Sequence, residues 1–190
     1  MDTLDVIQLV TSKVFHDMGN SITALSLLSS TSQDSNIQAS AVQELVERFK
    51  LLREVFVSTE DETDLSSCSK LLSQYFKGKK VTINSLVAEK HIPSDAYQVI
   101  LNLVMSVGAA ISHYGDIIVD FDDKICRVNA TGKGIVNRSF EYVMKNQLDK
   151  VEINTNNIQS YITLLLIQKG AFKINCTYNN NSFDIVLSWD

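Results

Sequence analysis

The first 60 residues repeat apolar positions at spacings of three and four, which is the period of an amphipathic helix. One helix is predicted from about Thr3 to Ser29, and a second from Ile37 to Phe56. The polar stretch Ser30 to Asn36 is rich in capping residues and predicts the turn between them. The apolar stripe expected to be buried comprises Ile7, Val10, Val14, Met18, Ile22, Leu25 and Leu28 in the first helix, and Ile37, Val42, Leu45, Phe49, Leu52 and Phe56 in the second.

Such a hairpin has broad apolar faces and no third layer of its own to cover them. The usual solution is to pair two hairpins as a four-helix bundle, so the pattern favours a homodimer. The alternative is that the hairpin packs on the C-terminal part of its own chain. Both arrangements are compatible with the pattern.

An acidic linker, Thr59 to Asp64, separates the hairpin from a region of mixed helix and strand patterns. Two domains are therefore expected, over residues 1–60 and 65–190. The second should be a two-layer α/β sandwich, in which helices cover one face of an antiparallel or mixed sheet, making the whole chain α+β. Its expected helices are 67–76, 94–113 after Pro93, 139–147 and one from Asn154–Thr155 to Gly170, and its expected strands are 81–84, 116–120, 125–129, 172–178 and 183–189.

Composition narrows the class of protein. The chain has 190 residues, a hydrophobic fraction of 45% and a charged fraction of 21%, which are ordinary for a globular protein. A net charge of -5 disfavours nucleic acid and anionic membranes as main partners. No apolar run is long enough to span a bilayer, and the acidic start is unlike a signal peptide, so a cytoplasmic location is expected.

Cysteines and histidines show no metal-ligand spacing. Cys68, Cys126 and Cys176 are scattered and are expected to be thiols, and His91 and His113 stand apart from them. No metal site is therefore expected. Four aromatic residues are expected in the core rather than at a ligand: Phe49, Phe56, Tyr75 and Phe76.

His16 is the residue whose setting points to chemistry. It lies roughly 200° around the first helix from Val14 and Met18, which places it among small and polar residues on the solvent side. An exposed imidazole is largely neutral near pH 7 and can attack phosphorus. The alternative is an ordinary surface histidine.

Three neighbours could assist His16. Asp17 is positioned to orient the imidazole or to accept its second proton, since it follows directly in the helix. Asn20, one turn later, could donate a hydrogen bond to phosphoryl oxygens, and Lys13, one turn earlier, could offset their charge. The candidate catalytic set is therefore His16, Asp17, Asn20 and Lys13.

A helical hairpin carrying the His16-Asp17 box, followed by an α/β sandwich, resembles the dimerisation and catalytic core of bacterial sensor histidine kinases over essentially the whole chain. The nucleotide motifs of that family are degraded. In its Asn box, Asn102 is kept, but Ser106 replaces the Mg²⁺-binding Asn and Ala109 replaces the Lys. In the first glycine box, 130–135, Ala130 replaces the Asp that reads adenine, and no second glycine box is present.

A kinase-like chain with a dismantled nucleotide site is similar to the dimeric histidine phosphotransferases of the ChpT type. This resemblance implies the histidine kinase ATPase (Bergerat) fold without kinase activity, in a cytoplasmic homodimer. It implies that His16 shuttles a phosphoryl group between aspartates on receiver domains of a hybrid histidine kinase and of response regulators. No cofactor of its own is expected, and Mg²⁺ is expected on the partner receiver.

Two other functions stay open from the sequence. One is a true histidine kinase with a divergent ATP site. The other is a non-catalytic dimeric adaptor, in which the sandwich only docks onto receivers. An ATP-binding assay separates the first from a phosphotransferase, and replacement of His16 separates the second.

Overall fold

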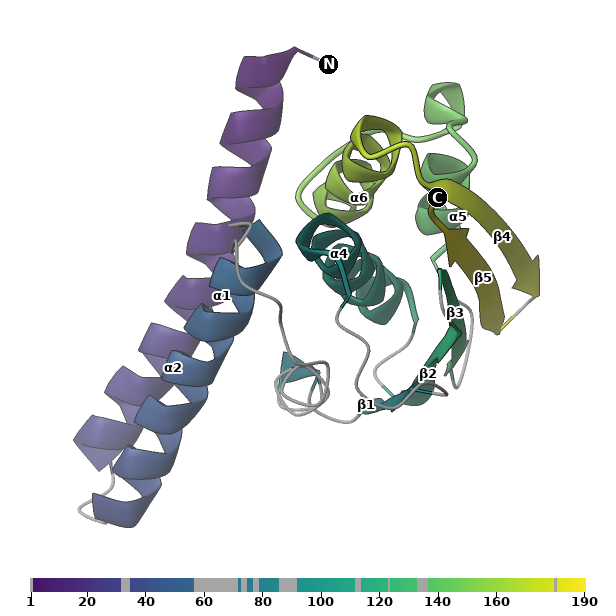
Figure 1. The fold of residues 1–190 in the computed structure, drawn as a ribbon. Coiled ribbons are helices and arrows are strands. Elements are labelled where there is room, and N and C mark those ends of the chain that lie inside the picture. The colour runs from purple at the N-terminus through teal and green to yellow at the C-terminus, as the bar shows by residue number, and fades with distance from the viewer. Residues whose placement is uncertain are drawn as a thin grey trace.

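A computed structural model gives the structure of the protein. It describes residues 2–31, 35–56, 72, 75–76, 79–85, 92–111, 114–122, 124–132, 137–179 and 181–190. The chain begins with two long antiparallel helices, α1 (Thr3–Thr31) and α2 (Ser35–Phe56), which form the predicted hairpin (Figure 1). Most of the helix expected over 67–76 and the acidic linker lie outside the described residues.

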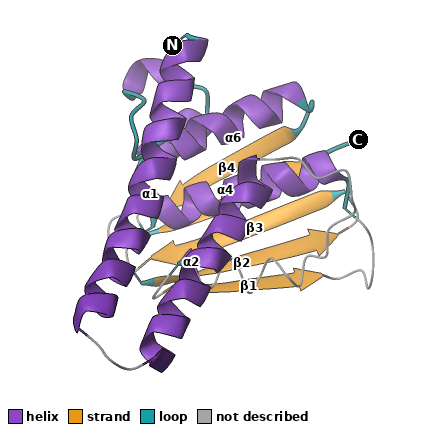
Figure 2. Cartoon of the chain, turned by 90° about the vertical axis from the view of Figure 1, so that its left-hand side faces the viewer, coloured by secondary structure: helices purple, strands orange, loops and turns teal. Residues whose placement is uncertain are grey.

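The rest of the chain is the predicted two-layer sandwich. Its elements are β1 (Lys79–Ser85), α4 (Ser94–Ala110), β2 (Gly115–Asp122), β3 (Ile125–Gly132), α5 (Ser139–Met144), the short 3-10 helix η1 (Leu148–Lys150), α6 (Ile158–Lys169), β4 (Lys173–Asn179) and β5 (Ser182–Ser188). The five strands run in the order β1-β2-β3-β5-β4, and the helices cover one face of this sheet (Figure 2). The sheet is mixed, because β1 pairs with β2 in parallel and the other pairs are antiparallel.

Alternation along the strands directs apolar side chains to the helix-covered face. In β2, Ile117, Val119 and Phe121 are buried, whereas Asp116 and Asp122 are exposed. The start of α6 is later than predicted, because Asn154 to Asn157 form a turn: Asn157 Oδ1 accepts a hydrogen bond from the Asn154 backbone N–H at 2.8 Å. Such boundary shifts leave the order of elements unchanged.

Helix α4 forms the middle of the core. It lies between the hairpin and the sheet (Figure 1), and nearly all its residues are buried. A helix that is apolar around its whole circumference is buried on all sides. Gly108 makes space for Phe76, since a Cβ atom at this position would lie 2.2 Å from the Phe76 ring. Phe76 is thus in the core, as predicted.

Helix α2 packs on the sandwich, so the hairpin does contact its own C-terminal part. Leu51 and Val55 are fully buried there. The amide of Asn102 in α4 donates hydrogen bonds to the backbone carbonyls of Val55, at 2.9 Å, and Gln98, at 2.8 Å. The side-chain amide of Gln159 in α6 donates in turn to Asn102 Oδ1. A buried polar chain therefore connects α2, α4 and α6.

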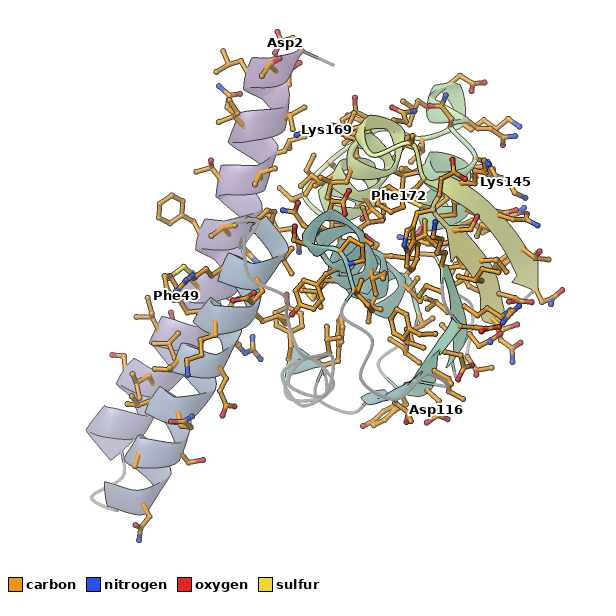
Figure 3. All side chains as sticks on the ribbon, in the orientation of Figure 1. Asp2, Phe49, Asp116, Lys145, Lys169 and Phe172 are labelled. Atoms are coloured by element: carbon orange, nitrogen blue, oxygen red, sulfur yellow. The ribbon has the colours of Figure 1, made fainter. Side chains whose placement is uncertain are left out.

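The hairpin leaves another face uncovered within a single chain. Ile7, Ile22 and Phe49 were expected to be buried, but they are 55%, 51% and 54% exposed. Figure 3 shows Phe49 on the side of the hairpin away from the sandwich. These predictions are wrong for the single chain, because the helical period locates an apolar face without specifying what covers it. Val42, also predicted to be buried, is 46% exposed, and further exposed apolar residues of the hairpin are Leu4, Phe15, Leu27 and Val46.

The two described cysteines, Cys126 and Cys176, are buried free thiols. Burial raises the pKa of Cys176 to about 11, so this thiol stays protonated and unreactive near neutral pH. Across the described residues, the structure has no helix long and apolar enough to cross a membrane.

Replacing Asn102 with Leu should destabilise the fold by about 2–4 kcal/mol, because the Val55 carbonyl and the Gln159 amide would lose their buried partner. Urea unfolding followed by circular dichroism measures the change. Asn129→Leu, at an exposed position of β3, serves as the control and should change stability by less than about 0.5 kcal/mol. Equal effects of the two substitutions would contradict the structural role of Asn102.

Candidate functional site

His16 lies in the middle of α1 with 71% of its side chain exposed. Asp17, the next residue, is turned toward the sandwich and its side chain is only 17% exposed. The difference follows from helix geometry, since consecutive residues point about 100° apart. The structure thus places His16 on an accessible surface, with Asp17 beside it at the junction of hairpin and sandwich.

The two ring nitrogens of His16 have different surroundings. Nδ1 lies 3.3 Å from Asp17 Oδ1, within reach of a hydrogen bond in which the ring N–H donates to the carboxylate. The Asn20 amide nitrogen lies 3.4 Å from Nδ1 and 3.4 Å from Nε2. An atom equidistant from both nitrogens does not lie along either in-plane lone pair, so Asn20 leaves the outward direction of Nε2 open.

Asp17 receives hydrogen-bond donors on its other oxygen as well. Lys13 Nζ lies 3.2 Å from Asp17 Oδ2, and the hydroxyl of Tyr75 donates to the same oxygen at 3.2 Å. The structure therefore brings together all four residues of the predicted set. Lys13 is paired with Asp17, where the sequence suggested only a charge one turn from His16.

Tyr75 is a site neighbour that sequence reasoning missed. It was expected in the core, and its half-buried ring does contact Phe76 edge-to-face, with centroids 5.0 Å apart. A buried tyrosine hydroxyl usually needs a hydrogen-bond partner, and this need was the available signal in the sequence. The signal does not identify the partner, which lies 58 positions away in the chain. Burial and the Asp17 carboxylate raise the pKa of Tyr75, so its hydroxyl remains a donor.

An open cleft of about 630 Å³ runs beside His16 between α1 and the sandwich. Ser12, Lys13, His16 and Asp17 line it from α1. On the opposite side it is lined by Ala109, Asn137, Thr155 and Asn156. The sandwich side thus offers amide and hydroxyl groups without charge, facing an exposed imidazole.

Asn102, Ser106 and Ala130 match the nucleotide motifs and lie inside the fold, whereas Ala109, at the position of the Lys, lines the open cleft. Asn102 is completely buried in the chain of hydrogen bonds between helices. Ser106 Oγ lies 2.9 Å from Thr163 Oγ1 of α6, which packs against α4. The space beside Ser106 amounts to about 10 Å³, room for one water molecule at most. Ala130 is buried in β3.

The described part of the chain contains no group of three or more His, Cys, Asp or Glu side chains that could hold a metal ion. His91, His113 and Cys68 lie outside it. The candidate site is therefore an exposed imidazole with its hydrogen-bond partners, beside a polar cleft.

The sequence matches the family profile of the histidine phosphotransferase C-terminal domain over residues 66–182, which is more than half of the chain. The chain belongs to this family. Membership of the histidine phosphotransferases implies phosphotransfer activity and partners in two-component signalling. The matched segment is the sandwich, so α1 and His16 lie outside it.

A solved structure of a bacterial phosphotransferase has the same fold as this histidine phosphotransferase over the whole chain. The two share 18% sequence identity, and the match covers 99% of this chain and 98% of the other, with a TM-score of 0.78. The likeness includes the hairpin, so the α+β fold predicted from sequence is confirmed.

Two histidine kinases are more distantly similar. One is the kinase domain of the Erythrobacter litoralis EL346 blue-light activated histidine kinase, with 16% identity, coverage of 89% and 94%, and a TM-score of 0.48. The other is Acinetobacter baumannii histidine kinase AdeS, with 10% identity, coverage of 90% and 95%, and a TM-score of 0.46. No curated protein matches the sequence.

Proposed function

We propose that this histidine phosphotransferase carries a phosphoryl group on His16, between aspartates of receiver domains and without using ATP. The observation that carries the proposal is the setting of the imidazole. Its Nδ1 faces the Asp17 carboxylate at 3.3 Å, while the ring is 71% exposed beside an open cleft. This combination suits a nucleophile that must meet another protein.

In the proposed step, the Nε2 lone pair of His16 attacks the phosphorus of a receiver's aspartyl phosphate. The N–P bond forms as the P–O bond to the aspartate breaks, and the aspartate leaves as a carboxylate. The ring becomes positively charged, and Asp17 holds its Nδ1–H and offsets that charge. The reverse step passes the group to a second receiver. Positioning of the two reactants supplies most of the catalysis in such transfers.

The cleft supports a receiver as the partner. An aspartyl phosphate is part of a folded domain, so the loop that bears it must approach His16 with its flanking chain. The cleft is open beside His16, and Asn137, Thr155 and Asn156 supply uncharged hydrogen-bonding groups on its far side. We place the partner surface on both α1 and the sandwich, for receivers of a hybrid histidine kinase and of response regulators. The receiver would bring its own Mg²⁺, and this chain would need no cofactor.

Filling of the nucleotide positions supports independence from ATP. Asn102 and Ser106 use their polar groups in contacts between helices, and α6 packs against α4 beside them. A nucleotide that used Asn102 or Ser106 as ligands would have to break these buried hydrogen bonds. This observation favours a phosphotransferase over a kinase with a divergent site.

The uncovered face of the hairpin supports a homodimer. Phe15 and Ile22 of α1 and Val42, Val46 and Phe49 of α2 are exposed apolar residues on a hairpin that already packs on its sandwich by another face. A second hairpin offers a matching surface, and two hairpins together give a four-helix bundle. His16 lies on a different side of α1 from Ile22 and stays accessible in this arrangement.

Incubation with a phosphorylated receiver domain, without ATP, should transfer label to the wild-type protein and not to His16→Ala. Gln8→Ala, an exposed substitution on the same helix, is the matched control and should accept label like the wild type. Gel electrophoresis under alkaline conditions preserves phosphohistidine and measures the label. If His16→Ala were labelled, another residue would be the carrier; if neither protein were labelled by several receivers, the adaptor function would be favoured.

Incubation with labelled ATP alone should leave the wild-type protein unlabelled, because Asn102 and Ser106 are engaged in contacts between helices. Calorimetric titration with Mg²⁺-ATP should likewise give no heat of binding. A histidine kinase of known activity in a parallel reaction is the control. Autophosphorylation of this protein at His16 would show it to be a kinase.

Sedimentation at micromolar concentrations should show a dimer for the wild type and dissociation for Phe49→Glu, since the substitution would place a charge in the bundle. Ile118→Glu, on the exposed face of β2, is the control for adding the same charge outside that surface and should remain a dimer. A monomeric wild-type protein would argue against the bundle.

A further inference from the structure

The carboxylate of Asp17 joins two parts of the molecule. Its Oδ1 faces His16 Nδ1 at 3.3 Å, and its Oδ2 accepts a hydrogen bond from the Tyr75 hydroxyl at 3.2 Å. His16 and Asp17 are neighbours on α1, whereas Tyr75 comes from the segment between the hairpin and β1. The Asp17 carboxylate therefore bridges the two side chains: one oxygen contacts the His16 imidazole and the other contacts the Tyr75 hydroxyl.

The ring of Tyr75 is fixed by contacts outside α1. It packs edge-to-face on Phe76, and the Arg48 guanidinium of α2 lies 5.5 Å from its centroid. Phe76 is buried against Gly108 of α4. The position of the hydroxyl is thus set by α2 and by the core of the sandwich, and it provides a fixed point toward which the Asp17 carboxylate is held.

Two donors occupy Asp17 Oδ2. Lys13 Nζ and the Tyr75 hydroxyl each lie 3.2 Å from it. A carboxylate held at one oxygen has its other oxygen fixed in direction, and here that oxygen is directed at His16. Hydrogen bonds to one nitrogen of an imidazole determine which nitrogen carries the proton and which the lone pair.

We propose that Tyr75 is a positioning residue for phosphoryl transfer: it holds the Asp17 carboxylate so that Nδ1 of His16 keeps the proton and Nε2 presents its lone pair to phosphorus. This inference rests on the proposed function of His16. The Tyr75 proton does not move during the step, since burial and the Asp17 charge keep the phenol protonated. Because Tyr75 lies outside the hairpin, the same hydrogen bond makes the tautomer of His16 depend on the position of the hairpin relative to the sandwich.

Tyr75→Phe tests the proposal, because it removes the hydroxyl and keeps the ring contacts with Phe76 and Arg48. Transfer of label from a phosphorylated receiver to His16 should slow roughly 10-fold, the effect of one lost hydrogen bond to a charged group. Tyr142→Phe removes a hydroxyl from α5 and should leave the rate unchanged.

Nuclear magnetic resonance of the ¹⁵N-labelled histidine rings gives a readout that a purely structural role would not move. The chain has 3 histidines, and the spectrum of His16→Ala identifies the signals of His16. The wild type should show the proton mainly on Nδ1, and Tyr75→Phe should shift it toward Nε2. In an Asp17→Asn background, Tyr75→Phe should cause no further change in the His16 tautomer, because the carboxylate that connects the two side chains is already absent.

An unchanged His16 tautomer in Tyr75→Phe would overturn the proposal, whatever the transfer rate. A slower transfer with an unchanged tautomer would assign Tyr75 a structural role only. If the wild type carried no label at all, the proposed function would fail, and the tautomer measurement would still decide whether Tyr75 positions Asp17. Thermal unfolding of each variant confirms that the comparison is between folded proteins.

Discussion

The hairpin and the sandwich are joined by one buried amide, that of Asn102, within the apolar core they share. It connects the last turn of α2, through the Val55 carbonyl, with α4 and, through Gln159, with α6. A buried polar group without a partner costs about 1–3 kcal/mol, so few packings of these helices satisfy every group. The orientation of α2 on the sandwich is thereby selected. Because α1 packs along α2, the same contact places His16 beside the cleft and Asp17 within reach of Tyr75.

Asn102 also shows how a side chain at a ligand-motif position can serve the packing of helices instead. By sequence it matches the Asn box of the sensor kinases, and Ser106 stands where that motif has its second Asn. In the structure both side chains serve the packing of helices, Ser106 through its contact with Thr163. A polar group that must be satisfied in the core can be satisfied by a ligand or by a neighbouring helix. Here α2 and α6 both provide partners, and the space beside Ser106 is too small for more than a water molecule.

The sequence allowed the hairpin and the order of the sandwich elements to be predicted, because helical and strand periods are local signals. The exposure of His16 followed from the same geometry. Two features were beyond its reach. The period of α2 places Phe49 in the predicted buried stripe and leaves Val55 out, yet Phe49 is exposed and Val55 is fully buried, since only the tertiary arrangement decides which face meets α4. The contact of Tyr75 with Asp17 joins positions 58 apart, and the need of a buried hydroxyl for a partner does not indicate which residue supplies it.

The exposure of His16 is itself consistent with a carrier. Contacts that stabilise the phosphorylated carrier and the transition state equally do not lower the activation barrier between them. A protein that must both accept and release a phosphoryl group therefore gains nothing from binding it tightly. With 71% of the ring exposed, the chain offers few contacts to a phosphoryl group on Nε2, so in the proposed transfer its stabilisation would fall to the receiver that docks. What the chain supplies is orientation and charge balance. Lys13 and Tyr75 both approach Asp17 Oδ2, which reduces the repulsion between that carboxylate and an incoming anionic group.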